Sequence, residues 1–304
     1  MLYNSAGVKK ALAGWAYDPD AVQVYGRALE AALRHAGARA VLERTVAAYE
    51  AGEEVDIRSV LEAMDGFAGA CGESPYTMRM LPYLCLLEPA RARYEAAGLD
   101  GAVYHDSFAD LLWKTRECRK IYGVWGSFVA PWFYRFFALR CFALGRLQFE
   151  WAVFQGDAPL ARGTPVLNVH VPSSGPLCME ECEASYARAV RFFGLSGREA
   201  VPFVCDSWLL HPLCAGLPEA SGIRRFAAAY RLLYVTEDPA RMDMWIIFGR
   251  PWDGNAAALP EGTALQRLFK AQLLSGGSVG RGYGLYLRQE RPVETPPGAP
   301  ALIG

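Results

Sequence analysis

Apolar residues in the first 120 positions recur at helical spacing, with polar residues between them. Asp18 and Pro19 begin one such run, which extends to residue 35, and Asp56, Ser74 and Asp106 are placed to begin others. Glycines that could end helices follow these runs: Gly37, Gly52, Gly72, Gly98 and Gly123. The pattern predicts an all-helical N-terminal domain over residues 1–122, followed by a second domain over residues 123–304.

The most hydrophobic stretch covers residues 121–144 and includes Trp125, Trp132, Phe133, Phe136 and Phe137. Pro131, Arg135 and Arg140 interrupt it, and only 14 residues pass without a charge. A bilayer span needs roughly 20 mainly apolar residues, so no membrane span is expected. We predict instead one buried aromatic helix that joins the two domains.

The pattern after this stretch changes to strands that alternate with helices. Residues 146–154 and 164–172 have strand composition and are expected to be neighbours in a sheet. Further strands are predicted over residues 201–208, 242–248 and 281–288, and helices over residues 180–193, 223–233 and 263–274. The chain is therefore expected to be an α+β protein with a mixed, largely antiparallel sheet.

Composition narrows the classes of function and the cellular location. The 31 basic residues nearly balance the 32 acidic ones, so the chain has no net positive charge with which to bind nucleic acid, and a nucleic-acid partner is not expected. Eight cysteines are scattered without a dense framework, and no secretion signal is visible, so reduced thiols and a cytoplasmic protein are expected. The four histidines show no paired metal-ligand spacing, so no metal site is expected.

Several segments, in order and spacing, resemble a family of bacterial acyltransferase-domain proteins. They are ALGRLQFE, VLNVHVPSSGPL, ASYARAVRFF, FVCDSWLL and LQRLFKAQLLSGG. In that family a helical N-terminal region precedes a GNAT-like C-terminal domain. The resemblance covers residues 105–290 well, and the N-terminal helices only by general character.

The resemblance implies acetyl-CoA or another acyl-CoA as co-substrate, held where a central strand separates from its neighbour. The pantetheine arm would pair with strand backbone, and the pyrophosphate would meet backbone N–H groups at the start of the next helix. In this chain the matching residues are Asn168, Val169, Val171, Ser173, Ser174 and Gly175. An ordinary turn from strand to helix is the alternative interpretation of this loop.

The chain departs from the family pattern at one pair of residues. Members usually read CHSWLLDP, where this chain reads CDSWLLHP, so that Asp206 and His211 are exchanged in type. The exchange suggests a structural or orienting contact between the two, although Asp206 remains a candidate catalytic residue.

Acyl transfer to an amine needs a base, and Glu150 is the first candidate. Arg146, Gln148 and Glu150 share one face of their strand, and His170, on the next strand, points to the same side as Asn168. Trp151 would raise the pKa of Glu150 toward the working range, with His170 in support. A solvated sheet face, an Arg146–Glu150 ion pair and a Cys205 nucleophile are the alternatives.

The resemblance, with these candidate residues, implies an acyl-CoA-dependent N-acyltransferase that moves a short acyl group to an amine of a small molecule or peptide. The alternative is a non-catalytic GNAT-derived protein that binds a ligand or acts as a scaffold. Nothing in the sequence marks the acceptor or the oligomeric state.

Overall fold

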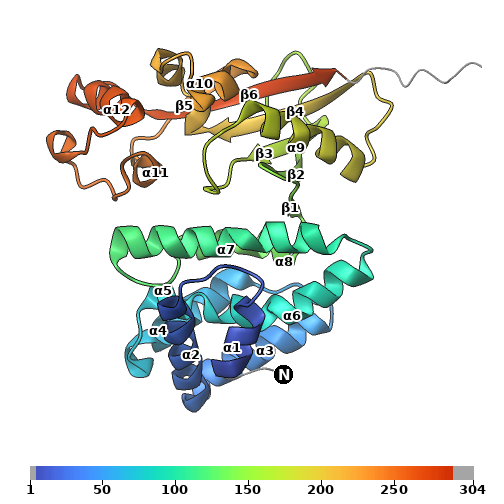
Figure 1. Cartoon of the computed structure of the whole chain (residues 1–304), viewed down its shortest axis with the longest axis vertical. Coiled ribbons are helices and arrows are strands. Elements are labelled where there is room, and N and C mark those ends of the chain that lie inside the picture. Colours follow the sequence, from blue (N-terminus) through green and yellow to red (C-terminus); the bar gives the residue numbers. More distant parts are fainter. Residues whose placement is uncertain (1–4, 290–304) are drawn as a thin grey trace, which may run out of the picture.

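The computed structural model describes residues 5–289 and has two regions stacked along its long axis (Figure 1). Helices form the N-terminal region, and a six-stranded sheet with flanking helices forms the C-terminal region. The α+β fold class predicted from the sequence is confirmed. The long helix α7 (Gly101–Tyr122) lies between the other N-terminal helices and the sheet region (Figure 1).

Local signals in the sequence begin the N-terminal helices. The side chains of Asp18, Asp56, Ser74 and Asp100 each accept a hydrogen bond from a backbone N–H in the first turn of the helix that follows. The helices of this region are α1 (Ser5–Leu12), α2 (Pro19–Arg34), α3 (Ala36–Glu50), α4 (Ile57–Cys71), α5 (Pro75–Met78), α6 (Leu81–Ala96), α7, the 3-10 helix η1 (Ala130–Phe133) and α8 (Tyr134–Phe137). Asp106, expected to begin a helix, instead lies inside α7.

The sheet has the strand order β1-β2-β3-β4-β6-β5. Its strands are β1 (Cys141–Ala143), β2 (Gln148–Val153), β3 (Pro165–His170), β4 (Ala200–Ser207), β5 (Arg231–Glu237) and β6 (Gly280–Gln289). Among the strands within residues 5–289, only β3 and β4 pair in parallel, because α9 (Met179–Phe192) crosses over between them. The expected pairing of β2 with β3 is confirmed, in antiparallel register.

The elements after β4 are mostly short. They are η2 (Trp208–Leu210), η3 (Pro212–Gly216), α10 (Gly222–Ala228), α11 (Met244–Phe248), η4 (Ala256–Ala258) and α12 (Ala264–Leu274). The predicted helix over residues 223–233 is half right, since α10 ends at Ala228 and β5 follows. The predicted strand over residues 242–248 is wrong, because this apolar run forms α11, and a short apolar run does not by itself separate helix from strand.

The predicted aromatic helix over residues 121–144 is also wrong. Gly123 ends α7 with φ of 71°, a loop follows, and Pro131 lies in the first turn of the 3-10 helix η1. The chain then turns through α8 into β1. The stretch still joins the two regions. The domain boundary predicted between residues 122 and 123 stays a prediction.

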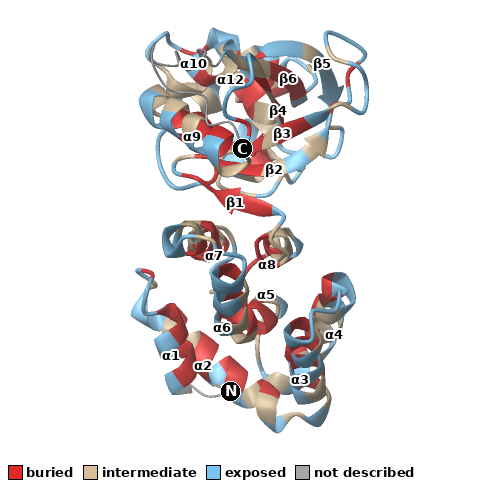
Figure 2. Ribbon diagram, turned by 90° about the vertical axis from the view of Figure 1, so that its right-hand side faces the viewer, coloured by how far each residue is buried: buried red, intermediate tan, exposed pale blue. Residues whose placement is uncertain are grey.

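One buried core continues from the helices into the sheet region. Phe136 and Phe137 are fully buried, and their carbonyls accept hydrogen bonds from Tyr94 and Tyr49, at 3.0 and 2.7 Å. Ser107 of α7 accepts a hydrogen bond from the backbone of Ala143 in β1 at 2.9 Å. Buried residues accordingly line both sides of the junction between α7, α8 and β1 (Figure 2). The position of α7 relative to the sheet is therefore fixed by the core.

Candidate active site

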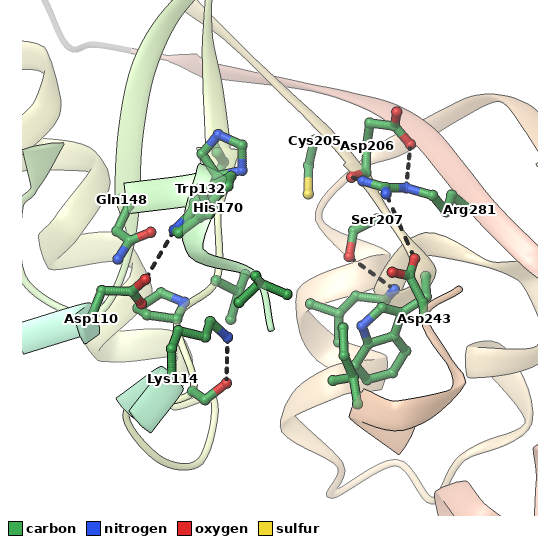
Figure 3. A pocket seen from close by; sticks show the side chains of 18 of the residues that line it. Asp110, Lys114, Trp132, Gln148, His170, Cys205, Asp206, Ser207, Asp243 and Arg281 are labelled. Atoms are coloured by element: carbon green, nitrogen blue, oxygen red, sulfur yellow. Dashed lines mark hydrogen bonds and ion pairs between the residues drawn. The ribbon is translucent and has the colours of Figure 1, made fainter. Parts of the chain in front are cut away.

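A cavity of about 760 Å³ opens between α7, the sheet and α11. Aromatic and aliphatic side chains form much of its lining, including Phe128, Trp132, Trp208, Trp245 and Ile246. Its charged groups lie on two opposite walls (Figure 3). A largely apolar cavity of this size with a few polar groups is typical of a site for an organic ligand.

The cavity lies where the two parallel strands separate. β3 and β4 pair only at Leu167 with Phe203 and at Asn168 with Val204. Beyond these pairs, residues 169–172 line the cavity from one side and residues 205–207 from the other. The family resemblance implies a ligand site at a separation of this kind, and β3 and β4 do separate at this point.

Glu150, Asn168 and His170 lie together on one face of β2 and β3. Glu150 Oε1 is 2.7 Å from His170 Nε2, 3.2 Å from Asn168 Nδ2 and 2.8 Å from Arg135 Nη1. An ionised carboxylate only accepts hydrogen bonds, so His170 Nε2 carries a hydrogen and donates a hydrogen bond to Glu150. In the neutral ring Nδ1 is then the proton acceptor. His170 lines the cavity, whereas Glu150 lies behind it, outside the described lining.

The predicted rise in the pKa of Glu150 is wrong. Burial alone would raise this pKa, but the hydrogen bond and charge of His170, with Arg135 and Asn168, lower it below its ordinary value. Trp151, expected to form the apolar wall, is 50% exposed and packs on Phe193 instead. Glu150 is thus an ionised, well-partnered carboxylate.

Arg146 does not pair with Glu150, so the Arg146–Glu150 ion pair considered as an alternative is wrong. Its guanidinium donates to the carbonyls of Pro172, Gly175 and Pro176, at 3.0, 2.6 and 2.9 Å. It therefore holds the loop after β3 in place and brings a positive charge to it. On the other side of the loop, Lys114 Nζ of α7 lies 3.4 Å from Ser173 Oγ.

The predicted cofactor residues divide into two groups. Val169, Val171, Ser173 and Gly175 line the cavity, while Asn168 and Ser174 are not among the described lining residues. The first turn of α9 carries Glu180 and Glu181, which disfavours a diphosphate at that helix start. Positive charge at the loop comes instead from Arg146 and Lys114.

Asp206 lies on the opposite cavity wall, away from Glu150 and His170. Arg281 donates to its carboxylate at 3.2 Å and to its carbonyl at 2.7 Å, and also lies 3.7 Å from Asp243 (Figure 3). His211 instead caps η3, where its side chain accepts a hydrogen bond from the backbone N–H of Leu213. The expected contact between Asp206 and His211 is wrong, because each side chain has a different partner.

Two cysteines near the site are poor nucleophiles. Burial, with the charge of Asp206, raises the pKa of Cys205 to about 12, which keeps it a thiol.

Cys141 lies with Glu150 and His170 in one group of possible metal ligands. However, burial raises the pKa of Cys141 well above its ordinary value, and Arg135 already neutralises Glu150. These contacts favour an ion-pair network over a metal site.

Sequence reasoning missed the contribution of α7 to the cavity. Asp110 and Lys114 of this helix line it, and Trp132 Nε1 donates to Asp110 Oδ2 at 2.9 Å (Figure 3). One signal was present, since Asp110 interrupts an apolar run between Phe108 and Leu111 at a position where burial is expected.

Comparison with known families accounts for most of the chain. Residues 7–139 match the N-acyltransferase N-terminal domain, and residues 141–286 match the GNAT-like C-terminal domain. The chain belongs to the N-acyltransferases with a GNAT-like C-terminal domain. The predicted family and enzyme class, an acyltransferase, are therefore confirmed.

Solved structures of acyltransferases have the same fold as this N-acyltransferase. One, in complex with decanoyl-CoA and teicoplanin, has a TM-score of 0.62 and 23% identity, and the match covers 94% of this chain and 85% of the other. A mutant acyltransferase in complex with octanoyl-CoA has a TM-score of 0.62 and 22% identity, with 94% and 84% covered. No curated protein matches the sequence. Among residues 5–289, no helix is both long and apolar enough to span a bilayer.

Proposed function

We propose that this N-acyltransferase uses an acyl-CoA and transfers a medium-length acyl group to the amine of a small molecule or peptide. The observation that carries the proposal is the separation of β3 from β4 over a large apolar cavity, with His170 on its wall. Similar folds that hold decanoyl-CoA and octanoyl-CoA support it.

Acyl-CoA would lie along the separated end of β3, with its pantetheine beside Val169 and Val171. The phosphates would meet the loop at Ser173 and Gly175, where Arg146 and Lys114 supply positive charge. Asn168 would help to hold the Glu150 carboxylate that positions His170, and Ser174 would contribute its backbone alone.

His170 would be the base and Glu150 the residue that positions it, which reverses the roles expected from the sequence. His170 Nδ1 would take a proton as the amine nitrogen attacks the thioester carbonyl carbon. A C–N bond forms, the oxyanion collapses and the C–S bond breaks. The proton then passes from His170 to the CoA thiolate, which leaves an amide and CoA. Asp206, bound to Arg281 across the cavity, would take no part in this proton transfer.

The size of the cavity favours a longer acyl group than the short one expected from the sequence. At about 760 Å³ with several aromatic walls, it offers room for an alkyl chain as well as for the acceptor. The acceptor class rests on the family, whose reaction is N-acylation, and teicoplanin in one similar structure indicates that large acceptors suit this fold.

Binding and turnover test the proposal separately. Thermal melts with acetyl-CoA, octanoyl-CoA and decanoyl-CoA should show stabilisation that grows with chain length, since a ligand at 100 times its Kd adds about 2.7 kcal/mol. Release of CoA thiol would then be followed with a panel of amines that includes glucosamine, benzylamine, a tripeptide and teicoplanin, with the amide identified by mass.

Each outcome has a distinct meaning. Stabilisation with amide formation supports the proposal, and equal stabilisation by acetyl-CoA and decanoyl-CoA would contradict the chain length. Stabilisation without an amide from any amine would favour the non-catalytic binding protein. No stabilisation by any acyl-CoA at millimolar concentration would overturn the proposal.

A further inference from the structure

The carboxylate of Asp110 is buried on the cavity wall and only half satisfied. Asp110 is 1% exposed, and Trp132 Nε1 donates to its Oδ2. Its Oδ1 has no hydrogen-bond partner within the described chain. The amide of Gln148 in β2 lies on the same wall, close enough to lower the pKa of Asp110, but Oδ1 still lacks a hydrogen-bond partner among the described residues (Figure 3).

Lys114, whose charge lowers the pKa of Asp110, forms no described ion pair with it. Lys114, one turn further along α7, forms its ion pair with Glu117 at 3.0 Å and lies over the ring of Trp245 at 5.3 Å. Burial raises the pKa of Asp110, and Lys114 and Gln148 offset this only in part. A buried oxygen without a donor destabilises the fold, so its retention on a cavity wall needs a reason.

Asp110 is connected to the proposed base through one aromatic ring. Trp132 donates to Asp110 with its indole nitrogen, and its ring packs edge-on against His170 with centroids 4.7 Å apart. A ligand group bound at Oδ1 would therefore lie on the same wall as His170.

We propose that Asp110 Oδ1 binds the acceptor as its ammonium, so that the site selects cationic amines, and that the ammonium loses one proton to solvent before the neutral amine, held in the same place, attacks the thioester. The reactive step rests on the proposed function, but recognition of the amine does not. The complement of a desolvated carboxylate is an ammonium, which forms a charge-assisted hydrogen bond. The amides of CoA are neutral and its phosphates anionic, which makes CoA a poorer complement.

The test compares two probes that differ in one group, benzylamine and benzyl alcohol. Both have a ring that suits the aromatic walls, and only benzylamine is cationic at pH 7. Their Kd values would be measured by calorimetry on the full chain without CoA, for wild type, Asp110→Asn and Asp106→Asn. Asp106 lies one turn earlier on α7, is half-exposed and lies outside the cavity, which makes it a matched control.

We expect the wild type and Asp106→Asn to bind benzylamine about tenfold or more tightly than benzyl alcohol. Asp110→Asn keeps the shape of the side chain and an oxygen for Trp132, so its affinity for benzyl alcohol should be unchanged while the preference for benzylamine is lost. With a productive amine, the same variant should raise the KM of the amine and leave the Kd of decanoyl-CoA unchanged.

Three results would overturn the inference. The first is that Asp110→Asn still binds benzylamine more tightly than benzyl alcohol. The second is that Asp110→Asn binds both probes equally more weakly than wild type, which would mean that Asp110 has a structural role. A weaker Kd for decanoyl-CoA in Asp110→Asn would indicate that CoA itself covers Oδ1. The Kd values of the two probes are measured without acyl-CoA. They therefore still test amine recognition if the proposed acyl transfer turns out to be wrong.

Discussion

Single residues decide the chemistry of this cavity, and the Glu150–His170 pair is the clearest case. We predict that Glu150→Gln lowers kcat with a productive amine by about 10²-fold or more, because the ring of His170 is then free to change tautomer. The Kd of decanoyl-CoA should stay the same, since Glu150 lies behind the cavity lining.

Arg135→Gln is the matched control for Glu150→Gln. It removes the guanidinium 2.8 Å from Glu150 but leaves the hydrogen bond from His170 to that carboxylate. Its loss of kcat should stay below about tenfold if proton transfer depends on the His170 tautomer. Equal losses in both variants that follow their melting temperatures would mean that the network is scaffold.

Asp110 has a pKa raised by burial, which predicts a dependence of stability on pH. A carboxyl whose folded pKa lies above its unfolded value destabilises the fold above the folded pKa, and this cost disappears as pH falls below the unfolded value of about 3.9. Asp110→Asn should therefore be more stable than wild type at pH 7 and show no gain at pH 3. Denaturant unfolding at both values checks this, and an equal gain at both would contradict it.

At the scale of elements, the loop from α7 to η1 is fixed by its contact with α5. A Cβ added at Gly126 would lie 2.4 Å from the backbone of Tyr76, and the Ser127 N–H donates to the Tyr76 carbonyl at 3.0 Å. Gly126→Ala should cost about 1–3 kcal/mol, because backbone must move. Gly69→Ala, exposed in α4 with open space around it, should gain about 0.5–1 kcal/mol. A Gly126→Ala variant as stable as wild type would contradict this interpretation.

At the scale of the whole molecule, the helical region and the sheet region share one core and should unfold together. Tyr94 packs against Phe142 of β1 at 6.0 Å between ring centroids, and Ser107 bonds the backbone of Ala143. We expect one calorimetric transition, which decanoyl-CoA moves upward as a unit because its proposed site uses α7 and both central strands. Two separate transitions, or a shift in only one of two, would show that the regions are independent.

The sequence by itself determined the elements whose signals are local. Helix N-caps such as Asp18 and Asp56, the alternation in β2 and β3, and the residue types near the separation of β3 from β4 were all readable along the chain. They were readable because capping, pleat periodicity and strand composition depend on neighbours within a few residues.

Only the tertiary structure decided which groups meet, because contact depends on chain segments far apart in sequence. It paired Glu150 with His170, and with Arg135 in place of Arg146, and these contacts lower a pKa that Trp151 was expected to raise. It placed Asp110 of the helical region on the same cavity wall as His170. It also turned residues 244–248 into a helix, since short apolar runs take the form that their packing requires.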